Sequence, residues 1–206
     1  MEWKPNTFRL FISHLSSNHL FAQDLASSLE NGFGVSGFVA HEDIEPSAEW
    51  QNEIEEALDS MDGLLALLTD RFSQNAWCNQ EVGWALGSNK ICVSVRDGED
   101  PPGFAGRFQA VRIGDRNTVR IAGEIFNLLA GHQKTAEQIA VSTSLNLLHA
   151  PSWEHINHVC VPCLNALTAF PEEALDNVER AFADNHRVAE AFKANEIRRF
   201  LNRHGR

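Results

Sequence analysis

Hydrophobic residues along this chain occur either in short continuous runs or at intervals of three to four positions. Short apolar runs predict buried strands, and intervals of three to four predict amphipathic helices. From Thr7 to about Leu129 the two kinds of segment alternate. This alternation is typical of a parallel sheet that is covered by helices on both faces.

The apolar runs predict strands over residues 8–12, 35–39, 63–68, 90–95 and 108–113. The run 63–68 is almost purely aliphatic, as expected for a central strand buried on both faces. Between the strands, helices are predicted from the inward-facing sets Phe21, Leu25 and Leu29, then Trp50, Ile54, Leu58 and Met61, and from residues 77–86 and 119–129. Ser47 is a suitable cap for the second helix. Residues 1–131 are therefore predicted to form one flavodoxin-like α/β domain with a five-stranded parallel sheet.

After residue 131 the alternation of strands and helices stops. Helical spacing continues over 138–148 and 153–167, and Pro171 is expected in the first turn of the next helix. Residues 188–201 either continue that helix or form another. Phe182, Phe192 and Phe200 are expected to pack in a core. The sequence thus predicts a mainly α-helical C-terminal region over residues 132–206.

Charge is distributed unevenly over the 206 residues, whose formal net charge is −11. Residues 1–131 hold 9 basic and 19 acidic side chains, whereas residues 132–206 hold 8 and 9. Between Arg9 and Arg71 there is no Lys or Arg, and the acidic residues from 42 to 62 are Glu42, Asp43, Glu45, Glu49, Glu53, Glu55, Glu56, Asp59 and Asp62. They form either a solvated helix face or a surface for a positively charged neighbour. Because phosphate backbones bind through Lys and Arg, nucleic acid is not an expected partner.

The chain shows no membrane-directed segment, since none of its apolar runs approaches the roughly 20 residues of a membrane span. Its first residues, MEWKPNTFRL, lack the basic start and apolar stretch of a signal peptide. We therefore expect a soluble, cytoplasmic protein. Its four cysteines, Cys78, Cys92, Cys160 and Cys163, are accordingly expected to be reduced.

The candidate chemistry lies where the strands end, because open α/β sheets bind ligands at the carboxyl edge. The run AWCNQEVGWALG follows the third strand and places Trp77 and Glu81 four residues apart on one helical face. A carboxylate beside an indole can stabilise a developing sugar cation while the ring covers an aromatic ligand. Spacing alone favours a different interpretation, in which Trp77 belongs to the core and Glu81 is a surface acid.

Four segments together resemble a TIR (Toll/interleukin-1 receptor) domain of the bacterial type. They are FRLFISH, FVAHEDIEPSAEW, LLALLTDRFSQNAWCNQEVGWALG and the aliphatic fourth strand, and the resemblance covers residues 7–131. It implies cleavage of the bond between nicotinamide and ribose in NAD+, giving ADP-ribose or a cyclic ADP-ribose-type signal. NAD+ would be consumed as substrate, with no cofactor and no metal. The short chain is similar to the stand-alone TIR proteins of Thoeris-like antiphage defence, which produce a nucleotide signal for a separate effector.

The resemblance also implies roles for individual residues. Glu81 closes the Trp-x3-Glu pattern and would be the catalytic carboxylate, with Trp77 beside the nicotinamide or its ribose. The remaining substrate contacts implied are His14, Leu15 and Ser16 after the first strand, and Glu42 and Asp43 after the second.

The chain departs from the family in the turn after the first strand. His14 stands where the family often has Tyr, and Leu15 and Ser16 stand where several NAD-cleaving relatives have basic residues. The diphosphate charge would then be met by backbone N–H groups, by Arg71, or by a second subunit. A homo-oligomer or TIR–TIR assembly is therefore expected.

Two other functions stay open on the sequence. One is a non-catalytic TIR adaptor or virulence effector, and the other is a related N-glycosidase that acts on nucleosides. The tail also contains zinc-type ligands in His155, His158, Cys160 and Cys163. They lie within nine residues, so that one short peptide would have to surround the ion, and no metal site is predicted.

Overall fold

The computed structural model of the chain describes residues 3–40, 48–101, 103–107 and 110–206. The predicted helix cap Ser47 lies outside these residues. In the described part of the chain, the sheet has five strands in the order β2-β1-β3-β4-β5. The strands are β1 (Phe8–Ser13), β2 (Val35–Val39), β3 (Gly63–Thr69), β4 (Ile91–Asp97) and β5 (Ala110–Arg112).

Neighbouring strands run parallel in a continuous register. Leu10 of β1 pairs with Gly63 of β3, which pairs in turn with Ile91 of β4. The order of the strands reverses beside β1, which is the flavodoxin-like arrangement. Every residue of β3 is buried, as its aliphatic sequence requires. The predicted α/β fold class is confirmed.

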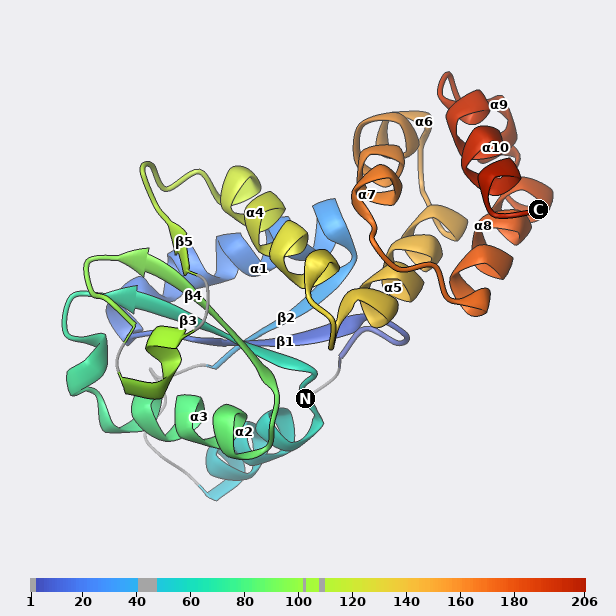
Figure 1. The fold of residues 1–206 in the computed structure, drawn as a ribbon. Coiled ribbons are helices and arrows are strands. Elements are labelled where there is room, and N and C mark those ends of the chain that lie inside the picture. The colour runs from blue at the N-terminus through green and yellow to red at the C-terminus, as the bar shows by residue number, and fades with distance from the viewer. Residues whose placement is uncertain (1–2, 41–47, 102, 108–109) are drawn as a thin grey trace. The chain divides into compact units, whose positions relative to one another are not determined.

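Helices cover both faces of this sheet, and Figure 1 shows α2 and α3 on one face and α1 with the start of α4 on the other. Their bounds are α1 (His19–Phe33), α2 (Ala48–Ser60), α3 (Ala76–Gly87) and α4 (Thr118–Gly131). The Ser28 hydroxyl of α1 donates to the Thr118 hydroxyl at the start of α4, at 2.8 Å.

The core beneath α2 and α3 is built from alternate strand residues, because successive side chains of a strand point to opposite faces. Phe11 of β1 and Leu64, Ala66 and Leu68 of β3 belong to this cluster. The cluster also contains Ile54, Ala57 and Leu58 of α2, Met61 just after that helix, and Cys78, Val82 and Ala85 of α3. The inward-facing positions predicted for α2 are thus confirmed at residues 54, 58 and 61.

The structure extends β4 beyond its predicted end at residue 95. Arg96 and Asp97 continue the strand because they pair in register with Leu68 and Thr69 of β3. The segment that follows β4 contains a 3-10 helix over Gly103–Arg107.

The C-terminal region is helical, as predicted. Its helices are α5 (Ala136–Leu148), α6 (Trp153–His155), α7 (Val161–Ala166), α8 (Glu172–Asp184), α9 (His186–Glu190) and α10 (Ala194–Arg203). The helix predicted over 153–167 contains a π-helical segment at Ile156–Cys160. Pro171 precedes α8 as its cap with an extended backbone, instead of lying in its first turn.

The predicted aromatic stripe of the tail is only partly correct. Phe200 is buried and Phe182 is half-buried, whereas Phe192 is 92% exposed. Phe192 lies between α9 and α10, where the helical path is interrupted. Helical spacing therefore does not predict the direction of its side chain.

The chain divides into two compact units that interleave along the sequence. The first unit contains Arg9–Glu30 and Ser36–Ile125, together with the described residues up to Lys4. The second, here called the helical unit, contains Pro5–Phe8, Asn31–Val35 and Phe126–Arg206. Within the helical unit, the Phe8 amide donates to the Ser142 hydroxyl of α5 at 2.7 Å. The division into domains at residue 131 stays a prediction.

No helix of the described residues combines the length and the apolar character that a membrane crossing needs.

Candidate functional site

Glu81 lies on the buried face of α3. The helix begins after Asn75, whose side-chain oxygen caps it by accepting from the Cys78 amide at 3.0 Å. Only 4% of Glu81 is exposed. Burial of a carboxylate costs free energy unless hydrogen bonds compensate for the lost water. A carboxylate in the position of Glu81 therefore needs hydrogen-bond donors close by.

Ser13 holds the carboxylate of Glu81 from the end of β1. Its hydroxyl donates to Glu81 Oε2 at 2.5 Å, and Ser13 itself is buried. O–H···O⁻ hydrogen bonds of this length are among the stronger ones in proteins. The last residue of the first strand thus orients the acid on α3. Ser13 was absent from the predicted site, although its place at the carboxyl edge of the sheet was a signal for it.

A pocket of about 230 Å³ opens beside Glu81. It is lined by Gln51, Ile54, Glu55 and Leu58 of α2 and by Trp77, Gln80, Glu81 and Trp84 of α3. Each helix contributes residues at positions i, i+3, i+4 and i+7, which is one continuous helical face. Small-molecule pockets usually measure roughly 300–1,000 Å³. This pocket therefore fits one ring with its sugar better than a whole dinucleotide.

Two tryptophans of α3 flank the acid along the pocket. Trp77 is 39% exposed and Trp84 is 38% exposed, while Glu81 between them is buried. The interpretation of a core tryptophan beside a surface acid is therefore wrong. α3 reverses the usual distribution, because its indoles reach the surface and its carboxylate faces inward. Indole faces are suitable surfaces for an aromatic or cationic ring.

The predicted contacts after β1 do not line this pocket. His14 is buried, Leu15 packs against the core beneath α2 and α3, and Ser16 is exposed in a short 3-10 helix. Glu42 and Asp43 lie outside the described residues. The structure thus brings Trp77 and Glu81 together but leaves His14, Leu15 and Ser16 outside the described pocket lining.

His14 has a structural part in the turn after β1. Its Nδ1 lies 3.1 Å from the Ile12 carbonyl, and its Nε2 lies 3.3 Å from His19 Nδ1. Since a carbonyl only accepts, Nδ1 of His14 carries the proton and donates. In the neutral ring, Nε2 then accepts from His19. The His14 carbonyl accepts from the Cys78 thiol at 3.5 Å, which ties the turn to α3.

A cation lies at the carboxyl edge of the sheet. Arg116 donates to Asp97 Oδ2 from Nε at 2.9 Å and to the Asn18 side-chain oxygen at 3.1 Å. Its guanidinium also lies over the Phe21 ring, 4.9 Å from the centroid. Asn18 in turn donates to the Thr69 hydroxyl at 3.1 Å. Arg116 was not among the predicted site residues, although it follows β5 by only a few positions, and Asp97 already balances its charge.

Arg71 has an exposed side chain and a left-handed backbone with a φ of 72°. The amides of Ser73 and Arg71 both donate to the Glu99 carboxylate, at 2.9 Å and 2.6 Å. The pKa of Glu99 is lowered, mainly by the bond from the Ser73 amide. Among the ion pairs of the described residues, none joins Asp70 to Arg71.

The acidic surface is smaller than the sequence indicates. Asp62 accepts from the Arg9 side chain at 2.8 and 3.0 Å and from its backbone amide at 2.9 Å. The hydrogen bond to Asp62 raises the pKa of Arg9. Asp62 is thus bound within the unit, whereas the exposed acids of α2 include Glu53, Glu55, Glu56 and Asp59.

The zinc-type residues of the tail do not form a metal site in the structure. Burial raises the pKa of the Cys160 and Cys163 thiols to about 12. His155 Nε2 lies 3.0 Å from the Asn146 side-chain oxygen, and burial lowers its pKa. Within the described residues, no group of three or more His, Cys, Asp or Glu side chains is placed to hold a metal ion.

The segment from β1 to α4 contains the five strands, the pocket between α2 and α3, and the Trp77–Glu81 pair. A sequence profile described as TIR domain matches residues 10–122, more than half of the chain. The chain belongs to the TIR domain family. The matched residues include Ser13, Trp77 and Glu81.

Among solved structures, the TIR domain of the Toll-related receptor TRR-2 from Hydra magnipapillata is similar to this TIR protein. The two are 17% identical, with a TM-score of 0.45, and the alignment covers 58% of this chain and 94% of that one. A search of curated proteins gives no match.

Proposed function

We propose that this TIR protein cleaves the nicotinamide–ribose bond of NAD+, giving nicotinamide and ADP-ribose or a cyclic ADP-ribose-type product. The observation that carries the proposal is the buried carboxylate of Glu81, which Ser13 holds at 2.5 Å in a pocket walled by Trp77 and Trp84. A buried acid in a cleft is a candidate for catalysis.

The chemistry needs little more than such an acid. Nicotinamide leaves as a neutral molecule, taking the electron pair of the bond to ribose, so it requires no proton. The ribose becomes an oxocarbenium-like cation, which a fixed carboxylate stabilises. Glu81 is placed to do this and to orient the ribose hydroxyls, while an indole covers the nicotinamide ring.

The acceptor of the ribose then determines the product. Attack by water forms a bond from oxygen to the anomeric carbon, releases a proton to solvent and gives ADP-ribose. Attack by a ribose hydroxyl or by the adenine of the same molecule gives a cyclic product. In the antiphage system that the sequence resembles, such a nucleotide would be the signal for a separate effector.

The diphosphate of NAD+ is the part of the substrate that this pocket is least suited to bind. Among the residues that the structure describes, its lining contains two carboxylates, Glu55 and Glu81, and no Lys or Arg. A dianionic group therefore needs cations from elsewhere. TIR domains generally assemble through TIR–TIR contacts, and we propose that a neighbouring subunit completes the site.

The test follows nicotinamide release from NAD+ by the purified full chain and by Glu81→Gln. We expect the substitution to lower the rate by at least about a hundredfold, because an amide does not stabilise the cation as a carboxylate does. Glu173→Gln is a matched control, since Glu173 is an exposed glutamate of α8 outside this pocket.

Release that survives Glu81→Gln would remove the acid from its proposed role. Failure of the unmodified protein to release nicotinamide, even when concentrated, would favour a non-catalytic TIR adaptor. Cleavage of nucleosides without cleavage of NAD+ would favour the N-glycosidase alternative.

A further inference from the structure

The helical unit contains a second pocket, of about 530 Å³, whose lining is polar. Its residues are Asn165 of α7 and Glu196, Arg199, Asn202 and Arg203 of α10. The volume lies within the range of roughly 300–1,000 Å³ that is usual for small-molecule sites. The pocket belongs entirely to the helical unit and shares no residue with the Glu81 pocket.

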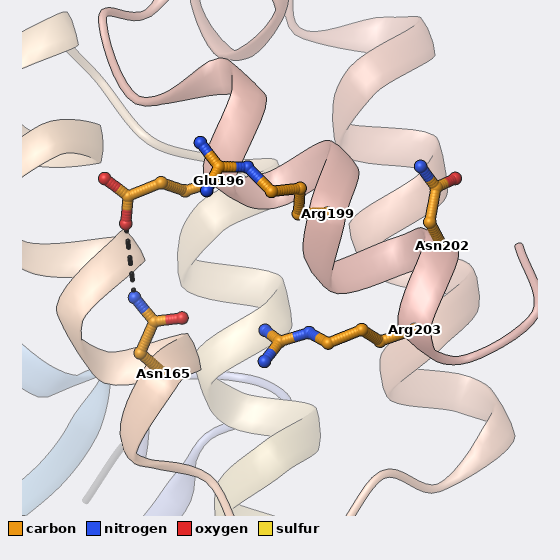
Figure 2. Close-up of a pocket in the computed structure, with 5 residues that line it drawn as sticks. All are labelled: Asn165, Glu196, Arg199, Asn202 and Arg203. Carbon is orange, nitrogen blue, oxygen red and sulfur yellow. Dashed lines mark hydrogen bonds between the residues drawn. The ribbon is translucent and has the colours of Figure 1, made fainter.

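The pocket exists because α10 is strongly amphipathic. One face of the helix is buried through Ala194, Ile197, Phe200 and Leu201. The opposite face carries Glu196, Arg199 and Arg203 at positions i, i+3 and i+7, which places them in one row. Figure 2 shows both guanidinium groups extending from α10 in the same direction, toward the side on which Asn165 lies.

The two arginines of this row carry uncompensated charge. Among the described residues, neither Arg199 nor Arg203 takes part in an ion pair. Like charges four residues apart on a helix repel each other. A cation in the last turn stabilises the helix dipole, which accounts for Arg203 but not for Arg199 one turn earlier.

Three other arginines of the helical unit, Arg180, Arg198 and Arg206, are each engaged by an acid or an aromatic ring. Arg206 pairs with the carboxylates of Glu172, Asp176 and Glu179. Arg180 lies 3.9 Å from Asp184, and the Arg198 guanidinium lies 5.4 Å from the centroid of the Phe182 ring. Four of the five acids of α8 are thus engaged by arginines outside the pocket, whereas Arg199 and Arg203 have no ion-pair partner among the described residues.

The single acid of the pocket is held at its edge. Glu196 Oε2 accepts from the Asn165 side-chain amide at 3.4 Å, as the dashed line in Figure 2 marks. A long hydrogen bond of this kind leaves most of the carboxylate's accepting capacity available. Carboxylates bind the hydroxyls of a ribose in nucleotide sites. The lining thus offers donors for phosphate and an acceptor for sugar hydroxyls.

We propose that this pocket binds the diphosphate group of a nucleotide, with Arg199 and Arg203 on the phosphates and Glu196 on the sugar hydroxyls. Two guanidinium groups match two phosphates, because each donates a pair of parallel hydrogen bonds to one of them. The net charge of the three ionised side chains favours an anion. This site goes beyond the proposed activity at Glu81 and does not depend on it.

The experiment is calorimetric titration of the full chain with ADP, inorganic pyrophosphate and adenosine. We expect saturable binding of ADP, weaker binding of pyrophosphate and none of adenosine. Arg199→Gln and Arg203→Gln should each weaken ADP binding by about tenfold or more, as expected for the loss of a charged hydrogen-bonding group. Arg180→Gln is the matched control, because it removes the same charge from an exposed position outside the pocket.

Glu196→Gln gives a more specific test, because the affinities for ADP and for pyrophosphate should change in opposite directions. Removal of the carboxylate should weaken ADP binding and strengthen pyrophosphate binding, because only the nucleotide has hydroxyls for Glu196 and both ligands are repelled by its charge. Equal effects on the two ligands would overturn the sugar contact.

Two results would overturn the diphosphate site itself. One is the absence of saturable ADP binding, and the other is ADP binding that survives both arginine substitutions. Glu81→Gln is titrated alongside, and retention of the arginine-dependent binding in this variant shows that the site stands whether or not Glu81 cleaves NAD+.

Discussion

At the scale of the residue, the bond from Ser13 to Glu81 connects the end of β1 to the middle of α3. The hydroxyl fixes one oxygen of the carboxylate, Oε2. Ser13 and Glu81 are 68 positions apart in the sequence, so only the fold brings the end of β1 close enough to α3 for this bond. Positioning of this kind lowers the cost of ordering the acid when substrate binds.

Ser13→Ala should therefore slow nicotinamide release while leaving the protein folded. The loss of a hydrogen bond to a charged group corresponds to about tenfold to a hundredfold in rate. Initial rates and a denaturation curve would be measured together. Ser27→Ala, on the exposed side of α1, is the control and should change neither. A rate for Ser13→Ala equal to that of the unmodified protein would contradict the positioning role.

The buried thiols predict how the stability of the protein depends on alkaline pH. Burial raises the pKa of Cys92, Cys160 and Cys163 from 9.0 to about 12. Below pH 9 each thiol is neutral in both states, and its contribution is fully present. Above pH 9 only the unfolded chain releases these protons, so each thiol should lower the free energy of unfolding by about 1 kcal/mol per pH unit up to about pH 12.

Urea denaturation at pH 8, 9.5 and 10.5 would measure this slope. The chain contains no tyrosine, so no phenol titrates in the same range. Cys92→Val should reduce the slope, since valine carries no titrating group in a site of similar size. An unchanged slope in Cys92→Val would show that this thiol does not contribute.

At the scale of the element, apolar runs predicted the strands well and predicted their ends less well. The strand β2 agrees with its predicted range, and β3, whose residues are mostly aliphatic, is only one residue longer than predicted. The extension of β4 to Asp97 depends on its pairing with β3, which no local pattern contains. The sequence pointed to Trp77 and Glu81 of α3, but the bond from Ser13 to Glu81 joins residues 68 positions apart, which no local pattern contains.

The glycines of two elements provide a test of how closely these elements pack. A Cβ added at Gly83, on the exposed side of α3, would meet nothing within 4 Å. Gly83→Ala should raise the free energy of unfolding by roughly 0.5–1 kcal/mol, because alanine favours the helix, and should leave nicotinamide release unchanged.

Gly37 of β2 gives the opposite expectation. A Cβ there would lie 2.8 Å from the Cβ of Ala26 on α1, so Gly37→Ala should destabilise the protein by about 1–3 kcal/mol. Thermal or urea denaturation of both variants checks the two signs. Stabilisation by Gly37→Ala would show that α1 yields easily to the added methyl group.

At the scale of the whole molecule, charge sets the conditions under which the proposed site works. The exposed acids of α2 lie on the helix that forms one wall of the Glu81 pocket. If a neighbouring subunit supplies cations there, specific activity should rise with protein concentration and fall as salt screens the attraction. Rates measured over a range of concentrations at low and moderate ionic strength would test this.

Reversing the charge of one acid on α2 tests the proposed contribution of a neighbouring subunit more directly. Glu56→Lys on α2 should lower activity at a fixed concentration, whereas Glu173→Lys, exposed on α8 of the helical unit, should not. Full activity of a dilute, monomeric protein would contradict the shared site.

The interleaving of the two units limits how this chain can be divided. Because Pro5–Phe8 and Asn31–Val35 group with the helical unit, no single cut of the backbone releases either unit complete. A fragment that ends at residue 131 would leave the Phe8 amide without Ser142 and the Gly32 carbonyl without the Cys163 thiol. A replacement of the C-terminal region by another sequence would therefore have to preserve its fit to two short N-terminal segments.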